Sequence, residues 1–142
     1  MPFDSTERWP PRTGNKTPRS LLARVFGRFV GRGPAPVTRE PLGPAVLRVL
    51  EEARGLIEER QDWTQGHYET FTGRRCAIGA LGAAAAVLDY EDAMAIARTL
   101  LADVARKRGY RDVEDMNDRS SHARVLEAFD AAIAAARARF VR

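Results

Sequence analysis

The sequence contains a single cysteine, Cys76, among its 142 residues. One cysteine cannot form an intrachain disulfide, and it excludes a zinc site built from several thiolates. A lone thiol also suits a reducing compartment. The chain is therefore unlike the small secreted domains that depend on disulfides, and the expected location is the cytoplasm.

Long apolar runs and targeting patterns are also missing. No stretch approaches the roughly 18–20 apolar residues that a membrane-spanning helix needs. Residues 1–5 lack the charged-then-apolar layout of a secretory signal. The phosphate-binding loop, the dinucleotide fingerprint, the serine-hydrolase elbow and the zinc-protease motif are absent too. The sequence therefore indicates no cofactor and no small-molecule substrate.

Positive charge is concentrated at one end of the chain. Residues 1–40 carry eight Lys or Arg and three Asp or Glu, a net charge of +5, whereas residues 41–142 carry fifteen and sixteen, a net charge of −1. Phosphate binding needs basic side chains clustered on one face. We therefore expect no nucleic-acid footprint over residues 41–142, and any polyanion contact should involve the N-terminal arm.

The arm divides into three predicted parts. Residues 1–19 are rich in Pro, Ser and Thr without periodicity, which is typical of a disordered tail. In residues 20–30 the large apolar side chains recur on one helical face, with Arg24 and Arg28 opposite, which predicts a short basic amphipathic helix. Residues 31–43 form a Pro/Gly linker by composition.

Three uses of this amphipathic helix remain open. It can lie on an anionic membrane, enter a groove of a partner protein, or fold back on its own domain. Exposure of its apolar face to water is unfavourable by about 25 cal/mol per Å², so we expect it to pack on something. Residues 8–39 include eight basic and no acidic side chains. Arg24 and Arg28 are thus candidate contacts to a protein, an anionic membrane surface or nucleic acid.

Beyond the linker, residues 44–142 predict one compact all-α domain. Apolar residues three and four positions apart indicate the helices. Asp89 is the predicted N-cap of the third helix, because acidic residues follow it in the first turn. The four main helices are expected at residues 44–61, 76–88, 90–108 and 121–140.

Two connections separate these helices, and neither is predicted to be regular. Residues 62–75 mix aromatic side chains with Thr and Gly, and residues 110–120 are polar, with Val113 and Met116 as inward anchors. The helix at 76–88 is rich in Gly and Ala. Because Gly costs a helix up to about 1 kcal/mol relative to Ala, we expect a compensating close approach by a neighbouring helix or by the 63–71 loop.

Three segments carry a resemblance. They are Trp63-Thr64-Gln65-Gly66, then Cys76-Ala77-Ile78-Gly79-Ala80-Leu81, then Asn117-Asp118. In this order the chain resembles a family of small, mostly helical bacterial and phage domains of unknown function, with the pattern W-x-Q-G, C-A-x-G-A-L and an N-D pair before the last helix. Met116 stands where that family has an aromatic residue. The resemblance spans about residues 44–138 and implies a fold without an activity.

Cys76 supports two interpretations. It follows Arg74 and Arg75 at a predicted helix N-terminus, and both features lower a thiol pKa. With His67 as base and Asp118 (or Asn117) as orienting group, it would form a Cys-dependent catalytic site. In the second interpretation Cys76 is a small buried residue at a tight crossing. A metal site from Asp118, His67 and His122 lacks a paired-ligand motif, so no metal is assigned.

The loop side chains are the binding candidates. They are Trp63, Gln65 and Tyr68, with Asn117 from the second connection. Aromatic side chains in a loop commonly cover a core, and Asn117-Asp118 either caps the last helix or braces the 63–71 loop. The leading hypothesis is a non-enzymatic binding or accessory domain. The alternative is a small enzyme that uses Cys76 with His67 and Asp118.

Overall fold

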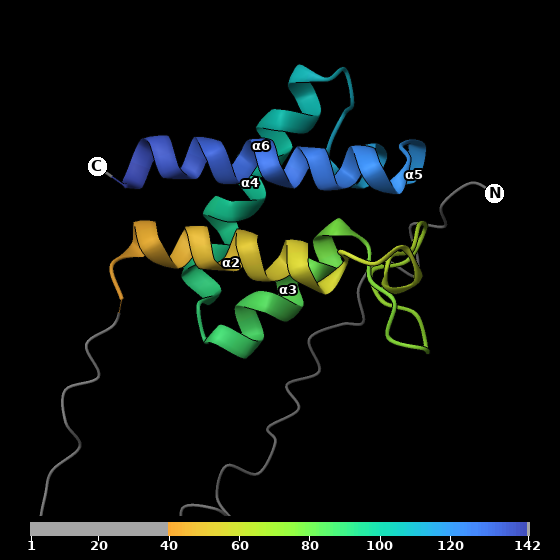
Figure 1. Ribbon diagram of the computed structural model, residues 1–142, viewed down its shortest axis with the longest axis horizontal. Helices are drawn as coiled ribbons and strands as arrows, with labels where there is room; N and C mark the ends of the chain where they lie inside the picture. The colour runs from red at the N-terminus through yellow and green to blue at the C-terminus, as the bar shows by residue number, and fades with distance from the viewer. Residues whose placement is uncertain (1–39, 142) are drawn as a thin grey trace, which may run out of the picture. The chain divides into compact units, whose positions relative to one another are not determined.

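The computed structural model describes residues 40–141, and this part of the chain is all-helical, as predicted (Figure 1). The tail, the amphipathic helix and most of the linker, with Arg24 and Arg28, lie outside the described residues. No described helix has both the length and the apolar character needed to cross a bilayer. The elements are α2 (Leu42–Leu56), η1 (Arg60–Asp62), α3 (Ala77–Leu88), α4 (Glu91–Lys107), α5 (Val113–Arg119) and α6 (His122–Phe140).

Helix α2 is the centre of the described fold. It contacts α3, α4 and α6, and Figure 1 shows it lying side by side with α6 in the opposite direction. One face of α2 is apolar, and its side chains are inaccessible to solvent. They pack with apolar residues from every neighbouring helix. The largest fully buried side chains include Leu50 and Ile57 near α2, Leu81 on α3, Leu101 on α4 and Phe129 on α6.

Three of the four predicted helices agree with the structure to within a residue. Cys76 and Ser121 cap α3 and α6 through their side chains, which accept from Gly79 N and Arg124 N. The first helix, predicted to reach residue 61, ends at Leu56. There the chain turns, because Ile57 N donates to Arg54 O and the Ile57 side chain enters the core.

The predicted role of Asp89 was wrong. Asp89 does not cap α4; it ends α3 in the left-handed conformation, with φ of 57°, and Tyr90 occupies the N-cap position of α4. Asp is one of the few non-glycine residues that adopt this conformation readily. The tight corner between α3 and α4 therefore depends on a backbone geometry that the charge pattern does not reveal.

The second connection contains a helix that the sequence pattern does not predict. Residues Val113–Arg119 form α5, and the Asp112 side chain caps it by accepting from Asp115 N at 2.7 Å. Val113 and Met116 are buried, as predicted for inward anchors. With only seven residues, α5 is too short to show a clear helical period.

The first connection folds back onto the start of α3. Two isolated bridges pair Trp63 with Arg75 and Glu69 with Arg75, and Cys76 N donates to Tyr68 O at 3.1 Å. Gly79 faces this carbonyl so closely that an added Cβ would lie 1.9 Å from Tyr68 O. The predicted close approach of the loop is therefore confirmed at Gly79. At the far end of α3, Val87 is exposed.

We predict that Gly79→Ala lowers the free energy of unfolding by about 3 kcal/mol, because the loop must separate from α3 to admit a methyl group. Chemical denaturation followed by circular dichroism measures this effect. Gly55→Ala is the matched control. Apart from its chain neighbours and the backbone of its own helix, no atom lies within 4 Å of the Cβ position at Gly55, which is in the last turn of α2. Helix propensity alone should stabilise this control variant by up to about 1 kcal/mol. An equal response of the two variants would contradict the packing explanation.

Candidate functional site

The Asn117 side chain joins three separate segments at the centre of the candidate site. Asn117 is buried, and its Oδ1 accepts from Trp63 Nε1 at 2.8 Å and from Ala77 N at 3.1 Å. Its Nδ2 donates to Thr64 O at 3.0 Å and to Asp118 Oδ1 at 3.2 Å. A single amide thus holds the indole, the loop backbone and the first turn of α3 together.

Gln65 and Asp118 extend this network to the surface. Gln65 Nε2 lies within hydrogen-bonding distance of the carbonyl oxygens of Asn117, Asp118 and Ser120, at 2.9, 3.2 and 3.0 Å. These carbonyls end α5 and would otherwise lack helical donors. In return, Asp118 Oδ1 accepts from Gly66 N at 2.9 Å. Of the two predicted roles for Asn117-Asp118, the structure shows the bracing of the loop; Ser121 caps the last helix.

Further contacts hold the side chain and the carbonyl group of Trp63. Its ring centroid lies 5.4 Å from that of His122, with the planes inclined by 40°. His122 Nε2 is 2.7 Å from Ile57 O, and since a carbonyl only accepts, this nitrogen carries the proton. Arg74 donates through Nε and Nη2 to Trp63 O at 3.1 and 2.7 Å. The indole is therefore a rigid element of the loop.

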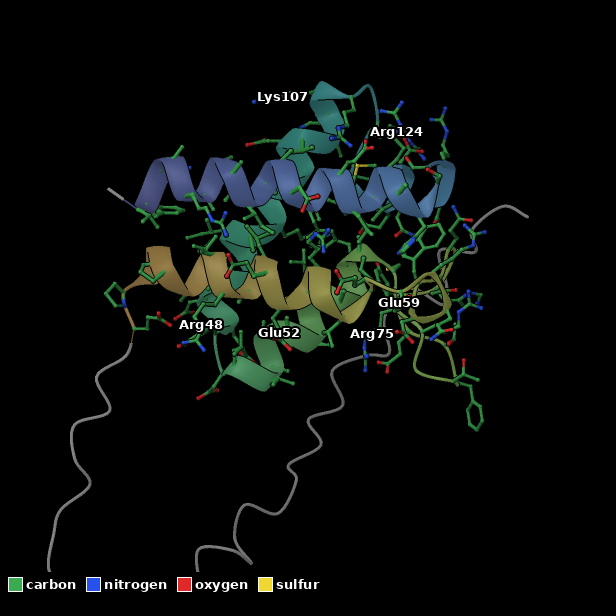
Figure 2. All side chains as sticks on the ribbon, in the orientation of Figure 1. Arg48, Glu52, Glu59, Arg75, Lys107 and Arg124 are labelled. Carbon is green, nitrogen blue, oxygen red and sulfur yellow. The ribbon has the colours of Figure 1, made fainter. Side chains whose placement is uncertain are left out.

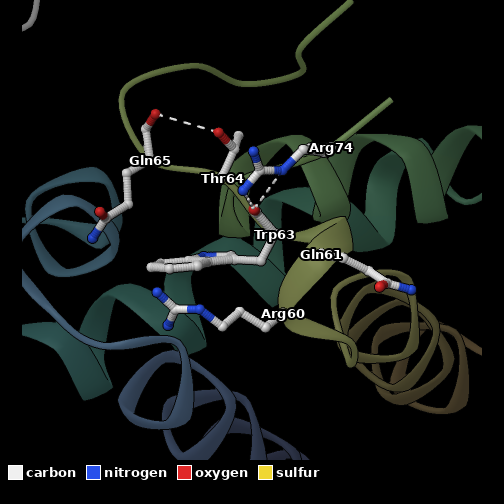
Figure 3. A pocket seen from close by; sticks show the side chains of 6 residues that line it. All are labelled: Arg60, Gln61, Trp63, Thr64, Gln65 and Arg74. Carbon is white, nitrogen blue, oxygen red and sulfur yellow. Dashed lines mark hydrogen bonds between the residues drawn. The ribbon is translucent and has the colours of Figure 1, made fainter. Parts of the chain in front are cut away.

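An open pocket of about 570 Å³ lies beside this tryptophan. In Figure 3, Arg60 extends along one side of the indole and Arg74 lies on the other side. The lining combines two guanidinium groups, two amides, a hydroxyl and the indole, and it contains no carboxylate. Its residues are Arg60, Gln61, Trp63, Thr64, Gln65 and Arg74.

The sequence motifs identify Trp63 and Gln65 in this pocket but not its two arginines. Arg60 falls within the first predicted helix, and the sequence marks Arg74 only as a neighbour of the Cys76 thiol. The early end of α2 places Arg60 on η1, at the mouth of the loop. No periodic pattern marks such a residue.

Cys76 does not have the properties of an activated nucleophile. Its side chain is buried, and this burial raises the pKa of the thiol to about 11. Hydrogen bonding from the backbone N–H groups of Gly79 and Ile78 acts in the opposite direction but is the smaller effect. Of the two interpretations of Cys76, the structure therefore agrees with the small buried residue, because desolvation outweighs the helix N-terminus.

The other proposed catalytic groups do not assemble around the thiol. His67 is exposed, and no hydrogen bond joins it to Cys76 or Asp118 in residues 40–141. Asp118 is engaged with Gly66 and Asn117, and its charge raises the pKa of Cys76 further. Tyr68 is partly buried, and its hydroxyl lies 3.5 Å from Glu114 Oε1. Within the described residues no three His, Cys, Asp or Glu side chains are arranged to hold a metal ion.

Comparison with known proteins adds one result to this geometry. A family described as a family of unknown function (DUF6197) matches residues 41–135. The chain belongs to this family. The part of the chain that matches DUF6197 contains the whole Asn117 network and the pocket beside Trp63. No curated protein and no solved structure matches the chain.

We predict that Asn117→Ala destabilises the fold by at least ~3 kcal/mol, because Trp63 Nε1, Ala77 N and Thr64 O lose their partner in a buried site. Thermal and urea unfolding measure this loss. Asp118→Asn is the matched control: it keeps an acceptor for Gly66 N at a less buried position, so the expected change is below ~1 kcal/mol. If Asn117→Ala lost no more than ~1 kcal/mol, as expected for the control, the network would not depend on Asn117.

We also predict that Cys76 reacts slowly with iodoacetamide at about pH 8 in the folded protein and quickly in urea, because the buried thiol keeps its proton. In the unfolded chain the pKa of this thiol is near its ordinary value of 9.0, whereas burial raises the pKa in the folded chain to about 11. The stability that this group contributes should therefore fall as the pH rises from 9.0 to about 11. The difference between the native protein and Cys76→Ser isolates this effect. Rapid alkylation of the folded chain near neutral pH would restore the thiolate hypothesis.

Proposed function

We propose that the domain is a non-enzymatic binding module, and that the pocket beside Trp63 receives an anionic group of its partner. The observation that carries the proposal is the charge of the lining. Arg60 and Arg74 both line the pocket, and no carboxylate in residues 40–141 pairs with either guanidinium. Most of the other described arginines are paired, so this lining is unusual within the domain.

The chemistry of the lining suits a carboxylate or an equivalent oxyanion. A guanidinium presents several N–H donors in a planar fork that matches the two oxygens of a carboxylate. Arg74 commits Nε and Nη2 to Trp63 O, which holds the rest of its guanidinium in a defined position. Gln61 and Thr64 add neutral polar groups to the lining. The pocket is open to water, so a single anion should bind weakly and the affinity must come from a larger contact.

The basic arm is a second element of the proposal. Residues 8–39 carry eight basic side chains and no acidic ones, and Arg24 and Arg28 belong to this segment. We infer from this charge that the arm contacts an anionic surface, and the candidates are a protein, a membrane and nucleic acid. Such binding should weaken as salt screens the charges.

The alternative function is a Cys-dependent enzyme. It required Cys76 as a thiolate next to His67 and Asp118. The thiol is buried with a raised pKa, and His67 makes no hydrogen bond to it in residues 40–141. Nothing in the described geometry favours this hypothesis, and we do not propose it.

We predict that sulfate and acetate shift the NMR signals of the Trp63 indole N–H and the Gly66 amide in the native chain, because both groups belong to the loop that lines the pocket. Arg60→Ala should reduce the shift at a given anion concentration at least about threefold, since it removes one of two cations. Arg106→Ala is the matched control. It removes the same charge from α4, where Arg106 pairs with Asp103.

Ionic strength is held constant during the titration, so that general screening cannot imitate binding. Arg60→Lys keeps the positive charge but removes the planar fork of the guanidinium. Its NMR shift should therefore lie between those of the native chain and Arg60→Ala. If Arg60→Ala and Arg106→Ala respond like the native chain, the pocket does not bind anions and the proposal fails.

A further inference from the structure

Phe71 is the most exposed large apolar side chain in the described part of the chain. Its relative exposure is 107%, compared with 76% for Val87, 53% for Val141 and 48% for Leu42. A single exposed apolar residue is ordinary on a protein surface. Phe71 differs because the backbone that carries it is tightly held.

Three hydrogen bonds fix the turn around Phe71. Gly73 N donates to Thr70 O at 2.9 Å, Thr70 N donates to Arg74 O at 2.8 Å, and Arg74 N donates to Thr70 Oγ1 at 3.0 Å. Gly73 has φ of 84°, a conformation that glycine adopts without strain. The phenyl ring is therefore presented on an ordered turn, and little backbone freedom remains to be lost when a partner binds.

The same turn ends at the anion pocket. Arg74 lies three residues after Phe71, and its guanidinium lines the pocket. The base of the turn is fixed to the domain by Cys76 N donating to Tyr68 O at 3.1 Å and by the Arg75–Glu69 ion pair at 2.8 Å. An aromatic anchor and a cation thus lie on one rigid segment. Protein interfaces concentrate their binding energy in residues of these types.

The charges around the turn indicate the class of partner. Figure 2 shows Glu59 and Arg75 at this end of the domain, and residues 58–75 carry four acidic and three basic side chains, a net charge of −1. Two of these carboxylates, Glu58 and Glu69, pair with arginines, so this surface carries charges of both signs and lacks the broad positive face that binding to a bilayer or a nucleic-acid backbone requires. A protein segment can place one carboxylate at the pocket and apolar surface at Phe71.

We propose that Phe71, Arg60 and Arg74 form a docking site for a partner protein whose binding segment carries a carboxylate side chain next to a large apolar one. This proposal rests on the proposed function of the pocket and adds the anchor and the chemistry of the partner. Phe71 packs against the apolar side chain, and the two arginines receive the carboxylate. The mixed charge of the surrounding surface disfavours broad polyanions.

A display library of random nonapeptides is selected for binding to the full chain. The most enriched peptide is then synthesised, and its affinity for the full chain is measured by calorimetry. The expected sequences place Asp or Glu next to Leu, Ile, Phe or Trp. Phe71→Ala should weaken binding of this peptide at least about tenfold. Val87→Ala, at an exposed apolar position on α3, is the control and should bind as the native chain does. Because Phe71 is fully exposed, its replacement should leave the melting temperature unchanged.

Several results would overturn the proposal. One is a selection that enriches no peptide, or that enriches basic peptides. Another is a selected peptide that binds the native chain and Phe71→Ala equally well. If Phe71→Ala binds the peptide normally but Arg60→Ala does not, the result contradicts the proposed docking site and supports the proposed anion pocket. If neither variant changes binding, both proposals fail. Phosphatidylglycerol vesicles and a single-stranded oligothymidylate complete the comparison. Phe71-dependent binding to either would replace the protein partner by a membrane or a nucleic acid.

Discussion

The hydrogen bonds of the Asn117 amide are the interaction on which the rest of the loop depends. An amide supplies both an acceptor and a donor at one buried point, and here both are used: Trp63 and Ala77 donate to it, and it donates to Thr64. An ionised carboxylate in the same place could accept from Trp63 and Ala77 but would have no donor for Thr64 O. The position of the indole, and with it the floor of the pocket, follows from this one side chain.

Prediction from the sequence succeeded where a signal was local and repeated. The apolar spacing located α3, α4 and α6, and the clustering of Trp63, Gln65 and Asn117 in motifs identified residues that the fold brings together. Prediction left two alternatives open where the outcome depended on competition between effects. The thiol of Cys76 is such a case, because the helix N-terminus and burial act on its pKa in opposite directions and only the three-dimensional structure shows which is larger.

Arg60 and α5 illustrate where prediction failed. Arg60 continues the charged face of α2 in sequence, and only the turn at Ile57 redirects it toward the loop. Helix α5 has seven residues, too few for a periodic pattern, and its stability comes from the Asp112 cap and from packing of Val113 and Met116. Tertiary contacts decide such elements, so a local sequence pattern does not predict them.

The contact between Gly79 and the Tyr68 carbonyl has a consequence for how the loop can be reused. The loop touches α3 backbone to backbone, and it is also attached to the carbonyls at the end of α5 and to the side chains of Asn117 and Asp118. It therefore cannot be transplanted into another scaffold as a peptide segment; α3 with its glycine and α5 with its Asn-Asp pair must move with it. Residues 70–73 lie beyond these attachments and are held by the hydrogen bonds of their own turn, so this turn would keep its shape in a transplanted unit.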